Sequence, residues 1–213
     1  MTDVPLDQRE REELCDLLLE LGPDAPTLCE GWTTADLAAH LVVRERDPRS
    51  MPGILKPDSR FGRTTANLIV KKKAAGYETV VARIRRGAPL IPWRIKGLRT
   101  LFNLNEYVVH HEDVRRANGL GPRTDRPDLD AAVWGLLQKG AKMTTRSVKG
   151  VGLVLRRPSG EEITVRKGEP VATITGEPVD VLLYLLGRRG AAQDESTGDP
   201  VAVTTLQAAK LGI

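Results

Sequence analysis

The residues best suited to metal chemistry in this chain are Glu106 and His110, four positions apart in the stretch NEYVVHHED. On a helix, at about 100° of rotation per residue, this spacing leaves the two side chains within about 40° of each other and one turn apart. Three apolar residues precede them on the same face, Leu98, Leu101 and Phe102. We therefore predict that the carboxylate and the imidazole point inward, where a charge is costly unless it is paired or bound to a metal.

His40 is the candidate for a third ligand. It shares one face of a predicted helix with Leu37 and Leu41 and is one of only three histidines in the chain. Two imidazoles and one carboxylate suit Zn²⁺ or non-haem Fe²⁺, and three protein ligands leave a coordination position open for water or substrate. His111 is rotated by about 100° from His110 and is predicted to point away from the same metal.

Simpler interpretations of these residues stay open on spacing alone. Glu106 and His110 could form an ordinary pair on a helix surface, and His40 could be a hydrogen-bonded core residue. Asp113, one turn beyond His110, could orient that imidazole as a carboxylate behind a metal ligand commonly does. It could equally pair with Arg115 or Arg116.

Arg44 and Cys29 lie near the candidate ligands in the sequence, and each can be interpreted as a functional or as a structural residue. Arg44, one turn after His40, could neutralise an anionic substrate, but a solvated arginine at a helix end is the simpler interpretation. Cys29 precedes a helix by several residues, and the sequence shows no obvious base for it. We therefore predict a buried structural thiol.

Helical periodicity and capping signals predict a series of helices up to Lys149. Asp7 with Glu10, and Thr33 with Asp36, form candidate capping boxes, the second with Trp32 before the cap. Residues 48–64 form a predicted long connection that borders the site. The predicted helices are residues 7–21, 33–47, 65–86 as one interrupted helix or two separated at Gly76, 95–118 and 129–147. At least four substantial helices joined by short connections predict an antiparallel bundle over residues 1–149, in which facing helices can build a metal site. The family resemblance described below implies that this is a four-helix bundle.

After Gly150 the sequence period changes to that of strands. Strands are predicted at residues 151–157, 162–166 and 170–175, and Pro178 and Pro200 each begin a predicted helix behind an acidic cap. Residues 150–213 are therefore predicted to form a small α+β domain, and the fold class is mainly α.

Composition narrows the class of protein further. The formal net charge of +4 comes from 32 basic and 28 acidic side chains, and no aromatic residues interleave the basic runs, so nucleic acid is not an expected partner. Two cysteines, no apolar leader sequence and no run of about 20 apolar residues predict a cytoplasmic protein with no membrane partner.

Three stretches, TLCEGWTTADLAAHL, NEYVVHHEDVRRANG and ITGEPVDVLLYLLGRRG, resemble the mycothiol-dependent maleylpyruvate isomerase family of actinobacteria. This family lies within the DinB-like superfamily of metal-binding four-helix bundles. In it, the histidine that ends a D-L-x-x-H-L pattern and a later Glu-x-x-x-His pair bind a divalent metal, usually zinc. The resemblance places these ligands at His40, Glu106 and His110.

The resemblance also implies an activity. Mycothiol, a small thiol, would be activated at the metal and attack a small electrophilic substrate, which makes the chain an isomerase or an S-transferase. Residues 48–64 and 89–96 would border the opening, and we find no match in them to the residues that hold maleylpyruvate, so we expect a sister group of unknown substrate. The alternative is a metal-binding module of the same superfamily without catalysis. A monomer or a homodimer is expected.

Overall fold

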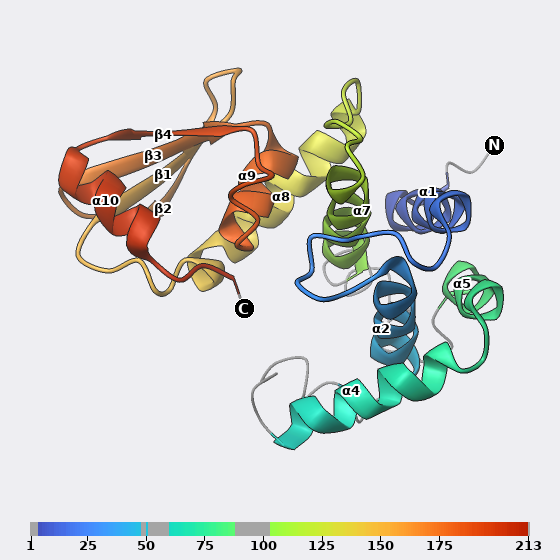
Figure 1. The fold of residues 1–213 in the computed structure, drawn as a ribbon. Coiled ribbons are helices and arrows are strands. Elements are labelled where there is room, and N and C mark those ends of the chain that lie inside the picture. Colours follow the sequence, from blue (N-terminus) through green and yellow to red (C-terminus); the bar gives the residue numbers. More distant parts are fainter. Residues whose placement is uncertain (1–3, 48–49, 51–59, 88–102, 213) are drawn as a thin grey trace. The chain divides into compact units, whose positions relative to one another are not determined.

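A computed structural model describes residues 4–47, 50, 60–87 and 103–212 (Figure 1). The chain divides into two compact units, Met1–Arg123 and Thr124–Ile213. The predicted mainly α fold, with a helical bundle followed by a small α+β part, is confirmed. In the part of the chain that is described, no helix is both long and apolar enough to cross a membrane.

The first unit is helical. Its helices are α1 Leu6–Leu21, α2 Thr34–Arg46, α4 Arg60–Lys73, α5 Tyr77–Arg85 and α7 Asn105–Ala117. Helix α1 contacts α5 and α7, and α2 contacts α4 and α5. Their shared core is made of leucine, valine, isoleucine and alanine side chains with Cys15 and Tyr107, so a sequence poor in aromatics still fills a bundle.

The predicted N-terminal capping box is present at one helix and absent at another. At α2 the predicted capping box is present, because the Thr33 backbone N–H donates to Asp36 Oδ2 over 3.1 Å. Trp32 packs against the core cluster that contains Leu37. At α1 the prediction is wrong: the N-cap is Pro5, and Asp7 lies buried in the first turn.

The predicted helical region of residues 65–86 is two helices. They are α4 and α5, separated at Gly76, whose positive φ of 86° glycine adopts without strain. Helix α4 begins at Arg60, so the predicted connection of residues 48–64 overlaps a helix. The first part of the predicted helix of residues 95–118, with Leu98, Leu101 and Phe102, lies outside the described residues, and α7 begins at Asn105.

The second unit combines a sheet with three helices. The strand order is β2-β1-β3-β4, with β1 Gly152–Arg156 antiparallel to β2 Glu162–Arg166 and parallel to β3 Val171–Gly176. Strand β4 Asp194–Gly198 runs antiparallel to β3, and helices α9 Pro178–Leu185 and α10 Pro200–Ala208 complete the unit. We did not predict β4, because the sequence DESTG lacks the apolar alternation that identifies a strand.

Helix α8 Pro127–Thr144 belongs to this second unit. It contacts α9 and β2, and its buried residues include Leu129, Val133 and Leu137. The division of the chain therefore falls after Arg123 and not at the predicted residue 149. The apolar stripe of α8 was visible in the sequence, but the surface that would cover it was not.

Candidate metal centre

Helices α2 and α7 bring together the three predicted ligands. Glu106 Oε2 lies 3.9 Å from His40 Nε2 and 3.5 Å from His110 Nε2. The two imidazole rings have centroids 5.3 Å apart and an interplanar angle of 75°. All three ligand atoms lie within 4.8 Å of one another. Two imidazole nitrogens and a carboxylate oxygen at this separation are a donor set that fits a divalent metal.

The local sequence explains why His40 faces this point. The capping box at Thr33 fixes where α2 begins and therefore which face each later residue takes. Leu37 and Leu41 are buried on the histidine's side of the helix, and the Trp32 ring lies 5.0 Å from the His40 ring. The imidazole is thus held between a packed core and an aromatic ring.

A buried polar contact next to Glu106 fixes α7 relative to α2. The Tyr107 hydroxyl donates a hydrogen bond to Glu45 Oε1 on α2. It also accepts one of 2.9 Å from Arg11 Nε on α1. Tyr107 and Glu45 are each about 1% exposed. Three helices therefore meet at the residue adjacent to a proposed ligand.

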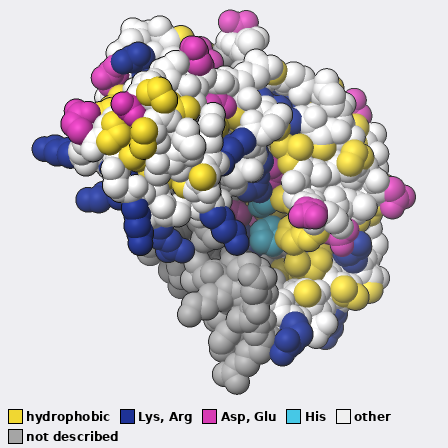
Figure 2. All heavy atoms as spheres, turned by 60° about the vertical axis from the view of Figure 1, so that its left-hand side comes forward, with side chains coloured by type: hydrophobic (Ala, Val, Ile, Leu, Met, Phe, Trp, Pro, Cys, Tyr) yellow, Lys and Arg dark blue, Asp and Glu magenta, His cyan; other side chains and the backbone are white. Residues whose placement is uncertain are grey.

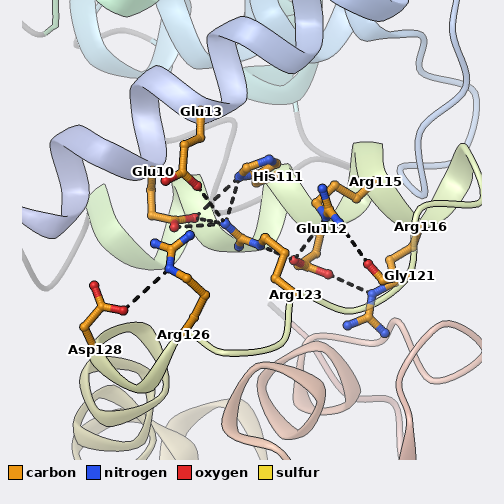
Figure 3. Close-up of polar contacts among 10 residues, drawn as sticks. All are labelled: Glu10, Glu13, His111, Glu112, Arg115, Arg116, Gly121, Arg123, Arg126 and Asp128. Atoms are coloured by element: carbon orange, nitrogen blue, oxygen red, sulfur yellow. Dashed lines mark hydrogen bonds and ion pairs between the residues drawn. The ribbon is translucent and has the colours of Figure 1, made fainter.

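His111 points away from the three candidate ligands, as predicted, and lies within a buried ion network (Figure 3). Its Nδ1 lies 3.5 Å from Glu10 Oε2 on α1 and 3.1 Å from Arg123 Nη1. Arg123 also contacts Glu10 and Glu112, each over 2.8 Å. This network attaches α7 to α1 and leaves the other face of α7, with His110, turned toward α2.

The network also contains a second group of ligand types, Glu10, Glu13 and His111. The Arg123 guanidinium already contacts all three, at 2.8 Å, 3.4 Å and 3.1 Å. An internal cation thus occupies the position that a metal would take. We interpret this group as structural.

The N-terminal residues of the chain resemble a known protein family. Residues 8–92 match the sequence model of a family described as the mycothiol maleylpyruvate isomerase N-terminal domain. The N-terminal part of this chain is therefore similar to that family domain. The matched residues include His40 and the capping box before it, and they end before Glu106 and His110.

Solved structures extend the likeness to the rest of the chain. The crystal structure of the mycothiol-dependent maleylpyruvate isomerase is 18% identical, with a TM-score of 0.52, and the match covers 92% of this chain and 95% of that one. A histidine-to-alanine mutant of that isomerase gives the same coverage and a TM-score of 0.53. At this identity the likeness shows a common fold. No curated protein sequence matched the chain.

The three candidate ligands are largely buried but retain some exposed surface. The side chains of His40 and His110 are each 10% exposed, and that of Glu106 is 25% exposed. Figure 2 shows histidine side chains reaching the molecular surface beside hydrophobic ones. Ligands held in this way can meet a molecule from solution.

Burial and neighbouring charges give the three groups different protonation preferences. Burial favours neutral Glu106, but hydrogen bonds from His110 and His40 and the charge of Arg44 outweigh it and hold the carboxyl pKa well below its usual value. Burial lowers the pKa of His40. It would do the same at His110, but hydrogen bonds to Asp113, Cys29 and Glu106 raise that pKa well above its usual value.

Asp113 lies directly behind His110, where sequence spacing suggested an orienting carboxylate. Its Oδ2 is 3.0 Å from His110 Nδ1, and the residue is fully buried. Arg116, one of the alternative partners, contacts Glu112 over 2.7 Å. The carboxylate therefore accepts the Nδ1 proton and leaves Nε2 directed at Glu106.

Cys29 differs from its prediction. The residue is half-buried, and its thiol lies 3.2 Å from Asp113 Oδ2 and 4.0 Å from His110 Nδ1. A carboxylate that can accept the thiol proton thus lies beside Cys29, for which the sequence showed no obvious base. Sequence spacing could not reveal this contact, because it joins a loop before α2 to α7, more than 80 residues along the chain.

Arg44 also differs from the simpler of its two interpretations. It is 6% exposed, so it is not a solvated residue at a helix end. Its Nε lies 3.2 Å from Glu106 Oε2, and its Nη1 donates to Asn103 Oδ1 over 3.4 Å. Sequence reasoning missed this ion pair and Asn103, although the spacing of four residues from His40 placed Arg44 on the correct face of α2.

Proposed function

We propose that this chain is a metal-dependent enzyme that uses a small thiol of the mycothiol class to isomerise, or add a thiol to, a small electrophile. The main support is the convergence of His40 Nε2, Glu106 Oε2 and His110 Nε2, all within 4.8 Å. The family of residues 8–92 and the fold shared with a mycothiol-dependent isomerase support the choice of thiol.

The protein residues define what the site would hold. Glu106 is ionised and His40 prefers its neutral form, so each offers a lone pair. Asp113 accepts the Nδ1 proton of His110 and thereby reserves Nε2 for a metal. Three ligands leave a position open, and zinc is the divalent metal that we propose. A divalent metal lowers the pKa of a neighbouring thiol, so it would supply a thiolate at neutral pH.

The proposed reaction has two variants. In both, the thiolate sulfur forms a bond to one carbon of an electrophilic double bond, and the π electron pair of that bond moves onto the adjoining electron-withdrawing group. If the C–C bond then rotates and the electron pair returns as the C–S bond breaks, the products are the isomer and the regenerated thiolate. If the adjacent carbon takes up a proton instead, the thiol adduct is the product, and the reaction is S-transfer.

Metal analysis of the purified protein tests the ligands. We expect one divalent metal per wild-type chain and a large loss of metal from His40→Ala and His110→Ala. His111→Ala is the matched control, since the third histidine faces Glu10 and Arg123. Undiminished metal in both ligand variants would refute the assignment.

A thiol-conjugation assay tests the chemistry. Metal-loaded protein should consume mycothiol with an electrophile that carries a cis double bond, or catalyse its isomerisation only when mycothiol is present. The chelated protein should do neither. Full thiol-dependent activity after chelation would contradict the proposal, and metal binding without any such activity would favour the non-catalytic alternative.

A further inference from the structure

We propose that Arg44 competes with the metal for Glu106 and, once the metal is bound, gives the site additional positive charge that favours anionic ligands. The inference rests on the proposed metal site but not on the use of a thiol. It concerns an arginine that contacts a proposed ligand directly.

The first observation is that Arg44 and the two histidines share one oxygen. Arg44 Nε lies 3.2 Å from Glu106 Oε2, closer than either His40 Nε2 at 3.9 Å or His110 Nε2 at 3.5 Å. A metal held between the histidines would use this same oxygen. Its binding therefore requires Arg44 to give up part of its contact with the carboxylate.

The second observation is that Arg44 cannot easily move into water. Its side chain is 6% exposed, and its Nη1 donates to the buried Asn103. A charged guanidinium in such surroundings keeps its position because leaving its partners buried and unpaired is costly. Arg44 should thus remain beside Glu106 after the metal has bound.

The charge balance gives the functional consequence. Arg44 already neutralises the Glu106 carboxylate, so a divalent cation beside them adds positive charge that this carboxylate cannot offset. Asp113, behind His110, supplies a more distant negative charge. Two positive charges a few ångströms apart in a partly buried site repel each other, which weakens metal binding, and both attract an anion at the open position.

Co²⁺ and azide are suitable probes, because both bindings are visible in the Co²⁺ absorption spectrum. Arg44→Met removes the charge and retains an apolar side chain of similar reach, whereas Arg44→Lys is the matched control that retains the charge. We expect Arg44→Met to bind Co²⁺ about tenfold more tightly and, when loaded, to bind azide about tenfold more weakly. Arg44→Lys should stay near wild type in both measurements.

Arg44→Met should raise the affinity for Co²⁺ and lower the affinity for azide. These opposite changes distinguish competition for Glu106 from a structural role of Arg44. If Arg44→Met bound Co²⁺ more weakly, Arg44 would be a positioning residue for Glu106 and the proposal would be overturned. Unchanged Co²⁺ and azide affinities would also overturn it, while leaving the metal site intact. Thermal unfolding of the metal-free variants checks the fold, and Arg44→Gln, which keeps a polar group beside Asn103, replaces Arg44→Met if that variant does not fold.

Discussion

Asp113 Oδ2 and His110 Nδ1 lie 3.0 Å apart, so the two nitrogens of one imidazole are committed to two different partners. The Nδ1 side faces a fully buried carboxylate, and the Nε2 side faces Glu106 and His40. A histidine held in this way presents one nitrogen at a fixed orientation. The proposed centre depends on this relationship as much as on the three ligands themselves.

Asp113→Asn should weaken metal binding by about 10- to 100-fold, because an amide holds the Nδ1 proton less strongly and lowers the basicity of Nε2. Titration with Co²⁺ or Zn²⁺ measures the change. Asp16→Asn is a matched control, since Asp16 is exposed on α1 and pairs with Arg85. Equal metal affinities for Asp113→Asn and the wild type would show that Asp113 has no orienting role.

Metal affinity should rise with pH through the neutral range. The pKa of His110 is raised well above its usual value, chiefly by Asp113 after the opposing effect of burial, so a metal must displace a proton from this ring near neutrality. The same shift should stabilise the metal-free fold at pH values below about 6.5, and that stabilisation should be lost as pH rises through the raised pKa.

Measurements of metal dissociation constants and of urea unfolding across pH check these two trends. In His110→Gln the alkaline loss of stability of the metal-free protein should be smaller. A metal affinity that does not change with pH would contradict the assignment of His110 as the protonated ligand.

How far the sequence could predict this protein is clearest at individual residues. The directions of the His40, Glu106, His110 and His111 side chains follow from helical spacing, because a helix fixes the direction of a side chain from its position. The meeting of His40 with Glu106 and His110 across two helices was expected from the family resemblance. The contacts of Arg44 and Cys29 were not predicted, because their partners lie on other elements. Glu106 is 62 residues beyond Arg44, and a contact of that range depends on how the helices pack.

The starts of the helices show the same difference between contacts within one element and contacts between elements. Thr33 and Asp36 form a local signal that predicted the start of α2 correctly. Asp7 and Glu10 have the same spacing but serve other purposes: Asp7 is buried in the first turn of α1, and Glu10 binds Arg123. An acidic residue that is needed by a distant arginine cannot be distinguished from a cap by spacing alone.

Asp194→Asn should stabilise the protein at alkaline pH. Burial and the nearby Asp180 raise the pKa of Asp194 to about 6, so its neutral form is favoured in the folded chain. The associated stability is present below the ordinary carboxyl pKa and is lost as pH rises through about 6. The amide in Asp194→Asn does not ionise, so the variant avoids this loss. Its free energy of unfolding at alkaline pH should be higher than that of the wild type by about 1 kcal/mol, a value that allows for the partial exposure of Asp194. Urea unfolding at acid and alkaline pH should show the difference only on the alkaline side.

Arg123→Met should destabilise the fold by about 3–5 kcal/mol, because it leaves the buried carboxylates of Glu10 and Glu112 without their shared cation. Arg156→Met is the matched control. Its partner Glu162 and Arg156 itself are each 44% exposed, and such pairs contribute about 0–1 kcal/mol. Urea unfolding measures both variants. Similar losses in the two would show that the network of Figure 3 does not hold α7 to α1, and His110 would then owe its orientation to α2 and Asp113 alone.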